Sequence, residues 1–241
     1  KLIFEIKKIM DSLQSKYDYE HIVIDNRSTD NTINILKKIA RENKNLKIII
    51  NTRNFGCIRS PFYGLLQAKG DAVIFLNSDF QDPPELIPNY IENWEKGHKI
   101  TLGQKTKTKE IIFMKYLKRI YYRTLNLIST VNLPLYTTGS GIYDQKIIEQ
   151  LRQIKDPYPY LRGLVAEFED EINLIQFEEP KRLGGRTKSN FFTYYDYVIL
   201  GLVKHSSMPL RLIIFLGFVL NLLSFVSALI YLFYKLIYWQ S

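Results

Sequence analysis

The sequence has few residues of the types that form covalent or metal cross-links. It contains one cysteine, Cys57, and three histidines that lie far apart in its 241 residues, His21, His98 and His205. A single cysteine excludes an intramolecular disulfide framework and a cysteine-based zinc site, and it is typical of proteins whose thiols stay reduced. The separation of the histidines gives no support for a histidine metal cluster. The sequence also contains no internal repeat and no low-complexity tract.

Charge is almost absent from the last thirty residues, where Lys235 is the only charged side chain, against 56 in residues 1–211. Between Arg211 and Lys235 lie twenty-three uncharged residues, enough for a helix that crosses a hydrocarbon core about 30 Å thick. The alternative is a wholly buried core helix, although such a long uncharged helix is unusual in a domain this small. Lys204 and Arg211 before the span, against Lys235 after it, predict that the large domain lies on the cytoplasmic side.

The preceding residues have the composition and the pattern of a folded α/β domain. The whole chain is 46% hydrophobic and 24% charged, which is too rich in core-forming residues for disorder. Helices are expected at 3–13, 30–40 and 60–69, and strands at 21–25, 46–50 and 71–76. This alternation predicts a parallel sheet with helices on both faces. Ligands of such sheets bind at the carboxyl ends of the strands, so the polar segments 25–26, 51–54 and 77–82 are expected to line a binding site.

The net charge of +9 is concentrated in two segments. Residues 99–123 carry eight basic side chains and one acidic one, and residues 181–188 carry four basic ones. Six acidic side chains between 167 and 179 oppose them. This segregation predicts a basic surface that faces phosphates. Nucleic acid is a poor candidate for the partner, because the basic segments precede a membrane span and no recognisable nucleic-acid-binding module is present.

Short motifs follow one another along the chain in a recognisable order. They are Asp-Asn-Arg-Ser-Thr-Asp-Asn-Thr at 25–32, Arg-Asn-Phe-Gly at 53–56, Asn-Ser-Asp-Phe-Gln-Asp-Pro-Pro-Glu at 77–85, Tyr-Leu-Arg-Gly at 160–163, Arg-Leu-Gly-Gly-Arg-Thr-Lys at 182–188 and Pro-Leu-Arg at 209–211. In this order they resemble the motifs of family 2 glycosyltransferases of the GT-A fold, in particular dolichyl-phosphate mannose synthase and bacterial polyprenyl-phosphate (bactoprenol) glycosyltransferases. The resemblance implies a Rossmann-like, mostly parallel sheet with helices on both faces, followed by amphipathic helices and a C-terminal transmembrane helix.

The resemblance implies an inverting, metal-dependent transfer of a sugar from a nucleotide-diphosphate sugar. The residues expected to bind this donor are Asp25, Asn26, Arg53, Asn54, Asn77, Asp79, Arg182 and Lys188. A divalent cation, Mg²⁺ or Mn²⁺, is expected on Asp79 and Gln81, with Asp79 as the catalytic residue, because such an ion neutralises a diphosphate leaving group through hard oxygen ligands. The alternatives are helix capping for Asp79 and Asp82 and a solvated turn for Arg182 and Lys188.

The acceptor implied by the resemblance is a membrane polyprenyl phosphate of the undecaprenyl or dolichyl type. Arg119, Arg123 and Arg162 are expected to bind its phosphate, and a basic helical face near the bilayer suits that role; a solvated or lipid-binding face without a part in the chemistry is the alternative. We expect a glycosyltransferase domain at 1–190, an interfacial amphipathic segment at 191–208 and a transmembrane segment at 209–241. The interfacial segment could equally be an ordinary surface helix, and a homo-oligomer is possible.

Departures from the family pattern give further expectations. The family's opening strand and its donor-contacting loop have no counterpart in the sequence, so we expect the fold to lack its first strand. Arg27 stands where the family has glycine, and arginine enters the left-handed region only at a cost. Asn77 replaces an aspartate and should weaken metal binding, while Gly139 stands in place of a proposed base. Two other functions stay open: a glycosyltransferase acting on a saccharide or another lipid, and a catalytically impaired membrane-anchored nucleotide-sugar binder.

Overall fold

The computed structural model describes residues 1–107, 136–168, 171–180 and 191–239, together with the single positions 116, 120, 123 and 134. Its helices are α1 Leu2–Ser12, α2 Thr32–Glu42, α3 Gly56–Leu66, α4 Ile87–Glu95, α6 Gln145–Gln153, α7 Leu161–Phe168, α8 Phe191–His205 and α9 Met208–Tyr238, with a 3₁₀ turn η1 at Pro84–Leu86. Its strands are β1 His21–Asp25, β2 Leu46–Ile50, β3 Ala72–Phe75, β4 Ile100–Lys107, β5 Thr137–Asp144 and β6 Asn173–Glu178. The first six elements confirm the expected alternation of helices and strands.

The strands form two separate sheets in the described part of the chain. β1 and β2 pair in parallel, with His21 opposite Leu46 and Asp25 opposite Ile50. The other sheet has the order β3-β5-β4-β6, in which β5 runs antiparallel to both of its neighbours while β4 and β6 are parallel. The α/β class is therefore confirmed, but the pairing is mixed rather than mostly parallel, because β5 returns between β3 and β4.

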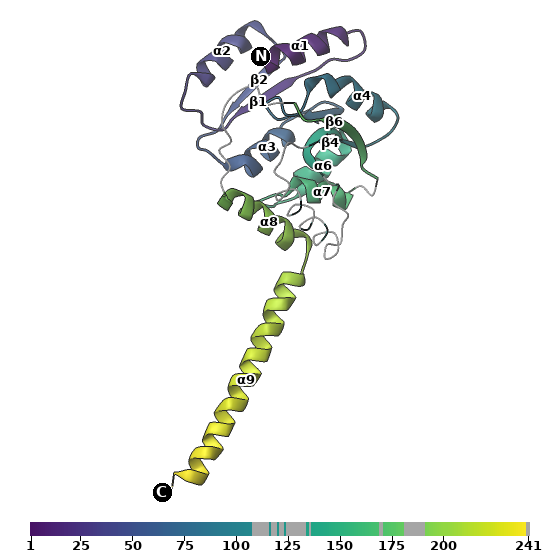
Figure 1. Cartoon of the computed structure of the whole chain (residues 1–241). Helices are drawn as coiled ribbons and strands as arrows, with labels where there is room; N and C mark the ends of the chain where they lie inside the picture. Colours follow the sequence, from purple (N-terminus) through teal and green to yellow (C-terminus); the bar gives the residue numbers. More distant parts are fainter. Residues whose placement is uncertain are drawn as a thin grey trace.

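Helices cover both faces of the strands, as the sequence predicted. On one face, Met10 of α1 and Tyr90 and Ile91 of α4 pack together with Ile142 of β5. On the other face, side chains of α3, α6 and α7 pack against Ile100, Leu102 and Tyr143, which are fully buried. Burial of these apolar side chains, each worth roughly 1.5–3 kcal/mol, supplies most of the stability of the larger sheet. Figure 1 shows α1, α2 and α4 at one end of the body and α8 at the other.

Helix α3 begins at Gly56, four residues before the expected start at Ser60. The helical spacing of apolar side chains extends back from Phe62 to Ile58, so the first turn has side chains to pack. Pro61 therefore lies inside the helix and not in its first turn. The loop after β2 is shortened to residues 51–55, which keeps its polar side chains close to the end of β1.

The C-terminal helix α9 has the length and composition of a membrane span. It runs for 31 residues, its most apolar window has a mean hydropathy of 2.5, and none of it is buried in the protein. Within the described residues it is the one helix that meets these criteria. Figure 1 shows it extending alone from the body below α8. Residues 206–207 are not helical and separate α8 from α9. Pro209 lies in the first turn of α9, where a proline removes no hydrogen bond.

Candidate active site

Three asparagine side chains at the ends of β1 and β2 form a hydrogen-bonded group, which we call the amide cluster: Asn26, Asn51 and Asn54. Asn51 Nδ2 donates to Asn26 Oδ1 over 3.1 Å and to Ser60 Oγ over 2.9 Å. Asn26 Nδ2 donates to Asn54 Oδ1 over 2.8 Å and to the Gly56 carbonyl over 3.1 Å. The cluster therefore ties the end of β1 to the loop that leads into α3, and the expected donor residues Asn26 and Asn54 hold this loop in place.

Asp25 and Arg53 directly precede two members of the amide cluster, Asn26 and Asn54, in the chain. Asp25 is buried, and its Oδ1 accepts a hydrogen bond of 2.9 Å from the Ser28 amide, which closes a tight turn. Arg27, inside that turn, has a φ of 68°, so the residue that replaces the family's glycine does adopt the left-handed conformation. Arg53 is exposed and its guanidinium lies 4.8 Å from the centre of the Phe55 ring. Its charge is therefore presented beside the loop, where an anionic ligand could reach it.

The end of β3 carries a second group, which we call the carboxylate cluster: Asp82, Asn77, Ser140 and Thr138. Asp82 is 1% exposed, and its Oδ2 accepts hydrogen bonds of 2.6 Å from both Asn77 Nδ2 and Ser140 Oγ. Thr138 Oγ1 donates to Oδ1 over 3.3 Å. Burial and the nearby Asp82 carboxylate raise the pKa of Tyr90. Asp82 thus links β3 to β5 inside the protein. Asn77, which was expected to bind the nucleotide sugar, donates a hydrogen bond to Asp82 instead.

Asp79 and Gln81 lie in the turn between Asn77 and Asp82. Asp79 Oδ1 accepts a hydrogen bond of 3.1 Å from the Gln81 amide, and Phe80 between them has a φ of 62°. The left-handed region is strained for a bulky residue, and such strain concentrates at functional sites. Gln81 Nε2 donates to Glu179 Oε1 over 2.6 Å, and Lys105 Nζ lies 2.7 Å from the same oxygen. Lys105 of β4 and Glu179, directly after β6, therefore fix the Gln81 amide through a partly buried ion pair.

A divalent cation suits this turn only if most of its ligands come from outside the protein. The described residues contain no group of three His, Cys, Asp or Glu side chains arranged to hold a metal. One carboxylate, Asp79, and one amide oxygen, Gln81 Oε1, match the ligands that Mg²⁺ uses when waters and substrate phosphates complete its shell. With Nε2 bonded to Glu179, the remaining amide atom of Gln81 is the oxygen that such an ion prefers.

Arg162 is the expected acceptor residue that the structure connects to the site. Its Nη1 donates to the Thr137 carbonyl over 3.0 Å, at the start of β5, and its guanidinium lies 5.4 Å from the centre of the Tyr160 ring. Arg123 is exposed at a single described position. Arg119, Arg182 and Lys188 lie outside the described residues. The structure thus brings together the expected residues from β1, β2, β3 and α7, but gives no position for the second basic motif.

Helix α8 lies directly against the loop of the amide cluster. Tyr197 Oη donates to Cys57 Sγ over 2.8 Å, which joins α8 to the first turn of α3. Burial and this hydrogen bond raise the pKa of Tyr197, while the charge of nearby Arg162 opposes the rise. Lys204 and Asp156 form an ion pair of 2.7 Å near the end of α8. The loop at the carboxyl ends of β1 and β2 therefore lies beside the helix that leads into α9, and Figure 1 shows α8 below α3.

Two functional candidates, Glu179 and Lys105, were missed by the sequence reasoning. In the sequence, Glu179 is one acid of the tract 167–179 and Lys105 is part of the basic segment 99–123. Their partners are far away in the sequence, since 74 residues separate them from each other and 98 separate Glu179 from Gln81. The one local signal is the position of Glu179 directly after β6, at the edge where ligands bind.

Comparison with known proteins identifies the chain. Its sequence matches the Glycosyl transferase family 2 over residues 5–152. The chain belongs to this family. It is 30% identical over 232 residues to the uncharacterized glycosyltransferase YkcC of Bacillus subtilis, covering 96% of this chain and 71% of that protein. It is also 25% identical over 211 residues to the prophage bactoprenol glucosyl transferase homolog of Escherichia coli, with 87% and 69% of the two chains covered.

A solved structure is also similar to this member of family 2. Residues 1–349 of TarS from S. aureus match with 17% identity and a TM-score of 0.44, covering 70% of this chain and 53% of that one. The family membership rests on the sequence matches. It makes the protein a glycosyltransferase, in agreement with the resemblance of its motifs.

Proposed function

We propose that this glycosyltransferase moves a sugar from a nucleotide-diphosphate sugar to the phosphate of a membrane polyprenyl phosphate of the undecaprenyl or dolichyl type. The observation that carries the proposal is the contact between Tyr197 and Cys57. It puts the strand-end site beside the helix that leads into the apolar helix α9, so a phosphate at the bilayer surface and a soluble donor can meet there. Relatives named bactoprenol glucosyl transferases support the same acceptor class.

The donor would lie along the carboxyl edge of β1, β2 and β3. Asp25 and the amide cluster shape the surface for its base and ribose, and Arg53 and Asn77 flank the path to the diphosphate. Asp79 and Gln81 would hold Mg²⁺ or Mn²⁺, which when bound neutralises the charge that develops on the departing nucleoside diphosphate. Arg182 and Lys188 would add a guanidinium fork and a point charge to the same phosphates.

The acceptor phosphate would approach from the side of α8. Arg162, whose charge acts on Tyr197, would receive it, with Arg119 and Arg123 contributing further positive charge. A phosphate is already ionised near neutral pH, so it can attack the sugar carbon without a strong general base, and the attack inverts the configuration at that carbon. This suits Gly139, which replaces the family's proposed base and whose Cβ, if it had one, would lie 3.7 Å from Arg162 Cγ.

The proposed arrangement divides the chain into a glycosyltransferase domain at 1–190, an interfacial helix at 191–208 and a span at 209–241. The domain would then lie on the cytoplasmic face, where nucleotide sugars are found, and the flanking charges of the span support this orientation. A homo-oligomer stays a prediction.

Asp79→Ala tests the proposal in protein purified into nanodiscs. With undecaprenyl phosphate and radiolabelled UDP-glucose or GDP-mannose, the variant should lose at least about 100-fold in turnover, the scale of losing one transition-state charge partner. Its thermal stability should be unchanged, because Asp79 is partly exposed. Glu92→Ala, an exposed acid of α4, is the matched control and should turn over like the wild type. Turnover of Asp79→Ala at the wild-type rate would overturn the metal and catalytic assignments.

Two rival functions are separated by the same preparation. Transfer to saccharide or to a lipid without a phosphate, but not to undecaprenyl phosphate, would favour another acceptor class. Donor binding by calorimetry without transfer to any acceptor would favour an impaired nucleotide-sugar binder.

A further inference from the structure

Arginine and aromatic side chains alternate in a short series that joins α3 to the loops before α3 and α7. We call this series the arginine ladder: Arg53, Phe55, Arg59 and Tyr158. The guanidinium of Arg53 lies 4.8 Å from the centre of the Phe55 ring, and that of Arg59 lies 5.3 Å from the same centre. The Arg59 guanidinium also lies 5.3 Å from the centre of the Tyr158 ring. Two positive charges therefore share one ring, and Arg59 lies against two rings.

The positive charge of the arginine ladder has no counter-charge among the residues that the structure describes. Neither Arg53 nor Arg59 forms an ion pair there, and the first turn of α3 contains no acidic residue. Asp156, in the loop that carries Tyr158, already accepts a hydrogen bond of 2.9 Å from the Tyr158 amide and forms an ion pair of 2.7 Å with Lys204. Because like charges repel, the ladder is complementary to a negatively charged ligand.

The two rings leave the hydrogen-bonding capacity of Arg59 available to such a ligand. A guanidinium has five N–H donors, and a contact with a ring face uses none of them in a hydrogen bond. Phe55 and Tyr158 restrict the orientation of the side chain, which lowers the entropy that binding would cost. Arg59 is only half-buried, so a ligand can reach it. An arginine held in this way presents a planar fork that fits two oxygens of a phosphate group.

A series of contacts leads from Arg59 to the end of α8. Arg59 contacts the Tyr158 ring, and the Tyr158 amide donates to Asp156. Asp156 in turn pairs with Lys204 in the last turn of α8, shortly before α9 begins at Met208. Figure 1 shows α8 between α3 and the start of α9. Lipid phosphates are the anions at a bilayer surface, so this position favours a lipid phosphate as the ligand.

We propose that Arg59 binds the phosphate group of a membrane lipid, and that Phe55 and Tyr158 hold its guanidinium in place for this purpose. The proposal deepens the proposed function and rests on it for the membrane span. Two lipids carry the required group: the polyprenyl phosphate acceptor and an anionic lipid of the bilayer. In either case Phe55 contacts two cations with different tasks, since Arg53 flanks the path of the proposed donor and Arg59 takes the lipid.

The test measures lipid binding by the protein in detergent micelles with native mass spectrometry, where the fraction of protein that retains a lipid gives an apparent Kd. The probes are undecaprenyl phosphate, phosphatidylglycerol and undecaprenol, which has the polyprenyl chain without the phosphate. Arg59→Gln should weaken the binding of a phosphate-bearing probe at least about tenfold, the scale of losing a hydrogen bond to a charged partner. Undecaprenol should bind equally to Arg59→Gln and to the wild type.

Three further variants separate the roles of the charge, the fork and the ring. Arg59→Lys keeps the charge without the fork and should bind more weakly than the wild type; it replaces Arg59→Gln in the test if thermal unfolding shows that the glutamine variant is misfolded. Tyr158→Leu removes one ring and should weaken phosphate-dependent binding by about two- to fivefold. Arg41→Gln, at an exposed arginine in the last turn of α2, is the matched control and should bind all three probes like the wild type.

The pattern of losses identifies the lipid or overturns the proposal. A loss confined to undecaprenyl phosphate would assign Arg59 to the acceptor, a loss confined to phosphatidylglycerol would assign it to bilayer lipid, and a loss for both would assign it to lipid phosphates in general. Unchanged binding of both phosphate probes would overturn the proposal. An equal loss for undecaprenol would also overturn it, since Arg59 would then recognise the chain and not the phosphate. These measurements contain no sugar donor, so a failure of the proposed transfer reaction is detected separately, in the nanodisc assay.

Discussion

The amide cluster and the carboxylate cluster lie at the same edge of the strands but are built in different ways. The amide cluster joins neutral groups, and its member Asn54 is exposed. The carboxylate cluster places a charge, Asp82, at 1% exposure and surrounds it with donors from β3 and β5. A neutral hydrogen bond contributes about 0.5–1.5 kcal/mol, whereas a buried charge that loses its donors is costly. The comparison teaches that one cluster shapes a loop and the other holds two strands together.

The largest effect is expected from Asp82→Ala in the carboxylate cluster. The substitution leaves Asn77 Nδ2 and the Ser140 hydroxyl without their shortest partner inside the protein. We expect a loss of about 3 kcal/mol in the free energy of unfolding, as for broken buried polar networks. Urea unfolding followed by tryptophan fluorescence in nanodiscs measures it. Asp82→Asn, which keeps the shape, should lose less. A loss below about 1 kcal/mol for Asp82→Ala would mean that the cluster is not an anchor.

A smaller loss is expected from Asn51→Ala in the amide cluster. Asn51 is buried, and its Nδ2 bridges Asn26 and Ser60. Losing two neutral hydrogen bonds should cost about 1–2 kcal/mol. Amide exchange in residues 53–56 should also become faster, because this loop loses its tie to β1. Asn34→Ala, in which an exposed helical amide is removed, serves as the control and should stay within about 0.5 kcal/mol of the wild type. Equal losses for Asn51→Ala and Asp82→Ala would break the comparison between the clusters.

Much of this architecture could be predicted because its signals are local. The apolar runs at 21–25, 46–50 and 71–76 are short and bounded by polar turns, and each became a strand within a residue or two of its expected ends. The rule that ligands bind at strand carboxyl ends then placed Asp25, Asn51 and Asn77 at one edge. Local patterns were enough here because each strand is followed at once by the polar residues of its own turn.

The parts that could not be predicted depend on distant contacts. Strand β5 contains two glycines and no long apolar run, and a Cβ on Gly141 would lie 2.1 Å from the Thr101 carbonyl oxygen. The close approach of β4 and a φ of 156° both require glycine here, and no local pattern reports that approach. Glu179 likewise gained its role from Lys105 and Gln81, which lie on other elements. The mixed pairing and the orientation of the Gln81 amide therefore needed the structure.

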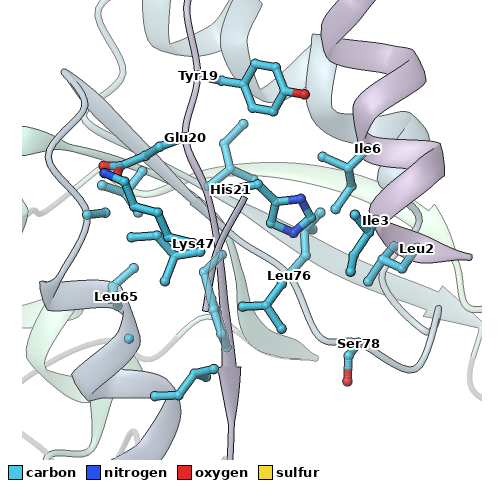
Figure 2. Close-up of a pocket in the computed structure, with 18 of the residues that line it drawn as sticks. Leu2, Ile3, Ile6, Tyr19, Glu20, His21, Lys47, Leu65, Leu76 and Ser78 are labelled. Carbon is cyan, nitrogen blue, oxygen red and sulfur yellow. The ribbon is translucent and has the colours of Figure 1, made fainter. Parts of the chain in front are cut away.

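The third prediction concerns pH and the smaller sheet. Burial lowers the pKa of His21 from its ordinary value of 6.5, and Ile6 and Leu76 lie near its ring in Figure 2. The folded protein thus binds this proton less readily than the unfolded chain. Stability is unaffected above pH 6.5 and falls as the pH drops through 6.5 towards the folded value, by at most about 1.4 kcal/mol per pH unit for one proton.

His21→Val should flatten this decline between pH 7 and pH 5. Urea unfolding at several pH values measures the slope, and exchange of the β1 amides shows whether the smaller sheet is the part that loosens. His98→Gln, at an exposed position, should keep the slope of the wild type. Identical slopes in wild type and His21→Val would show that the acid sensitivity belongs to other groups.

The smallest effect, and the only gain, is expected at Arg27 beside the amide cluster. Its φ of 68° costs a residue with a Cβ about 1–2 kcal/mol, while glycine adopts it freely but loses more entropy on folding. Arg27 is exposed, so Arg27→Gly should stabilise the protein by about 0.5–1 kcal/mol. Arg27→Ala keeps the Cβ and should give no gain; equal gains in both variants would point to the arginine side chain and not to the backbone.

Phe80, with a φ of 62° in the turn of Asp79, is half-buried, so Phe80→Gly would lose packing as well as strain and should not gain stability. The strain of a positive φ can thus be relieved at Arg27, beside the amide cluster. At Phe80, beside the carboxylate cluster, the packing of the side chain outweighs the same strain.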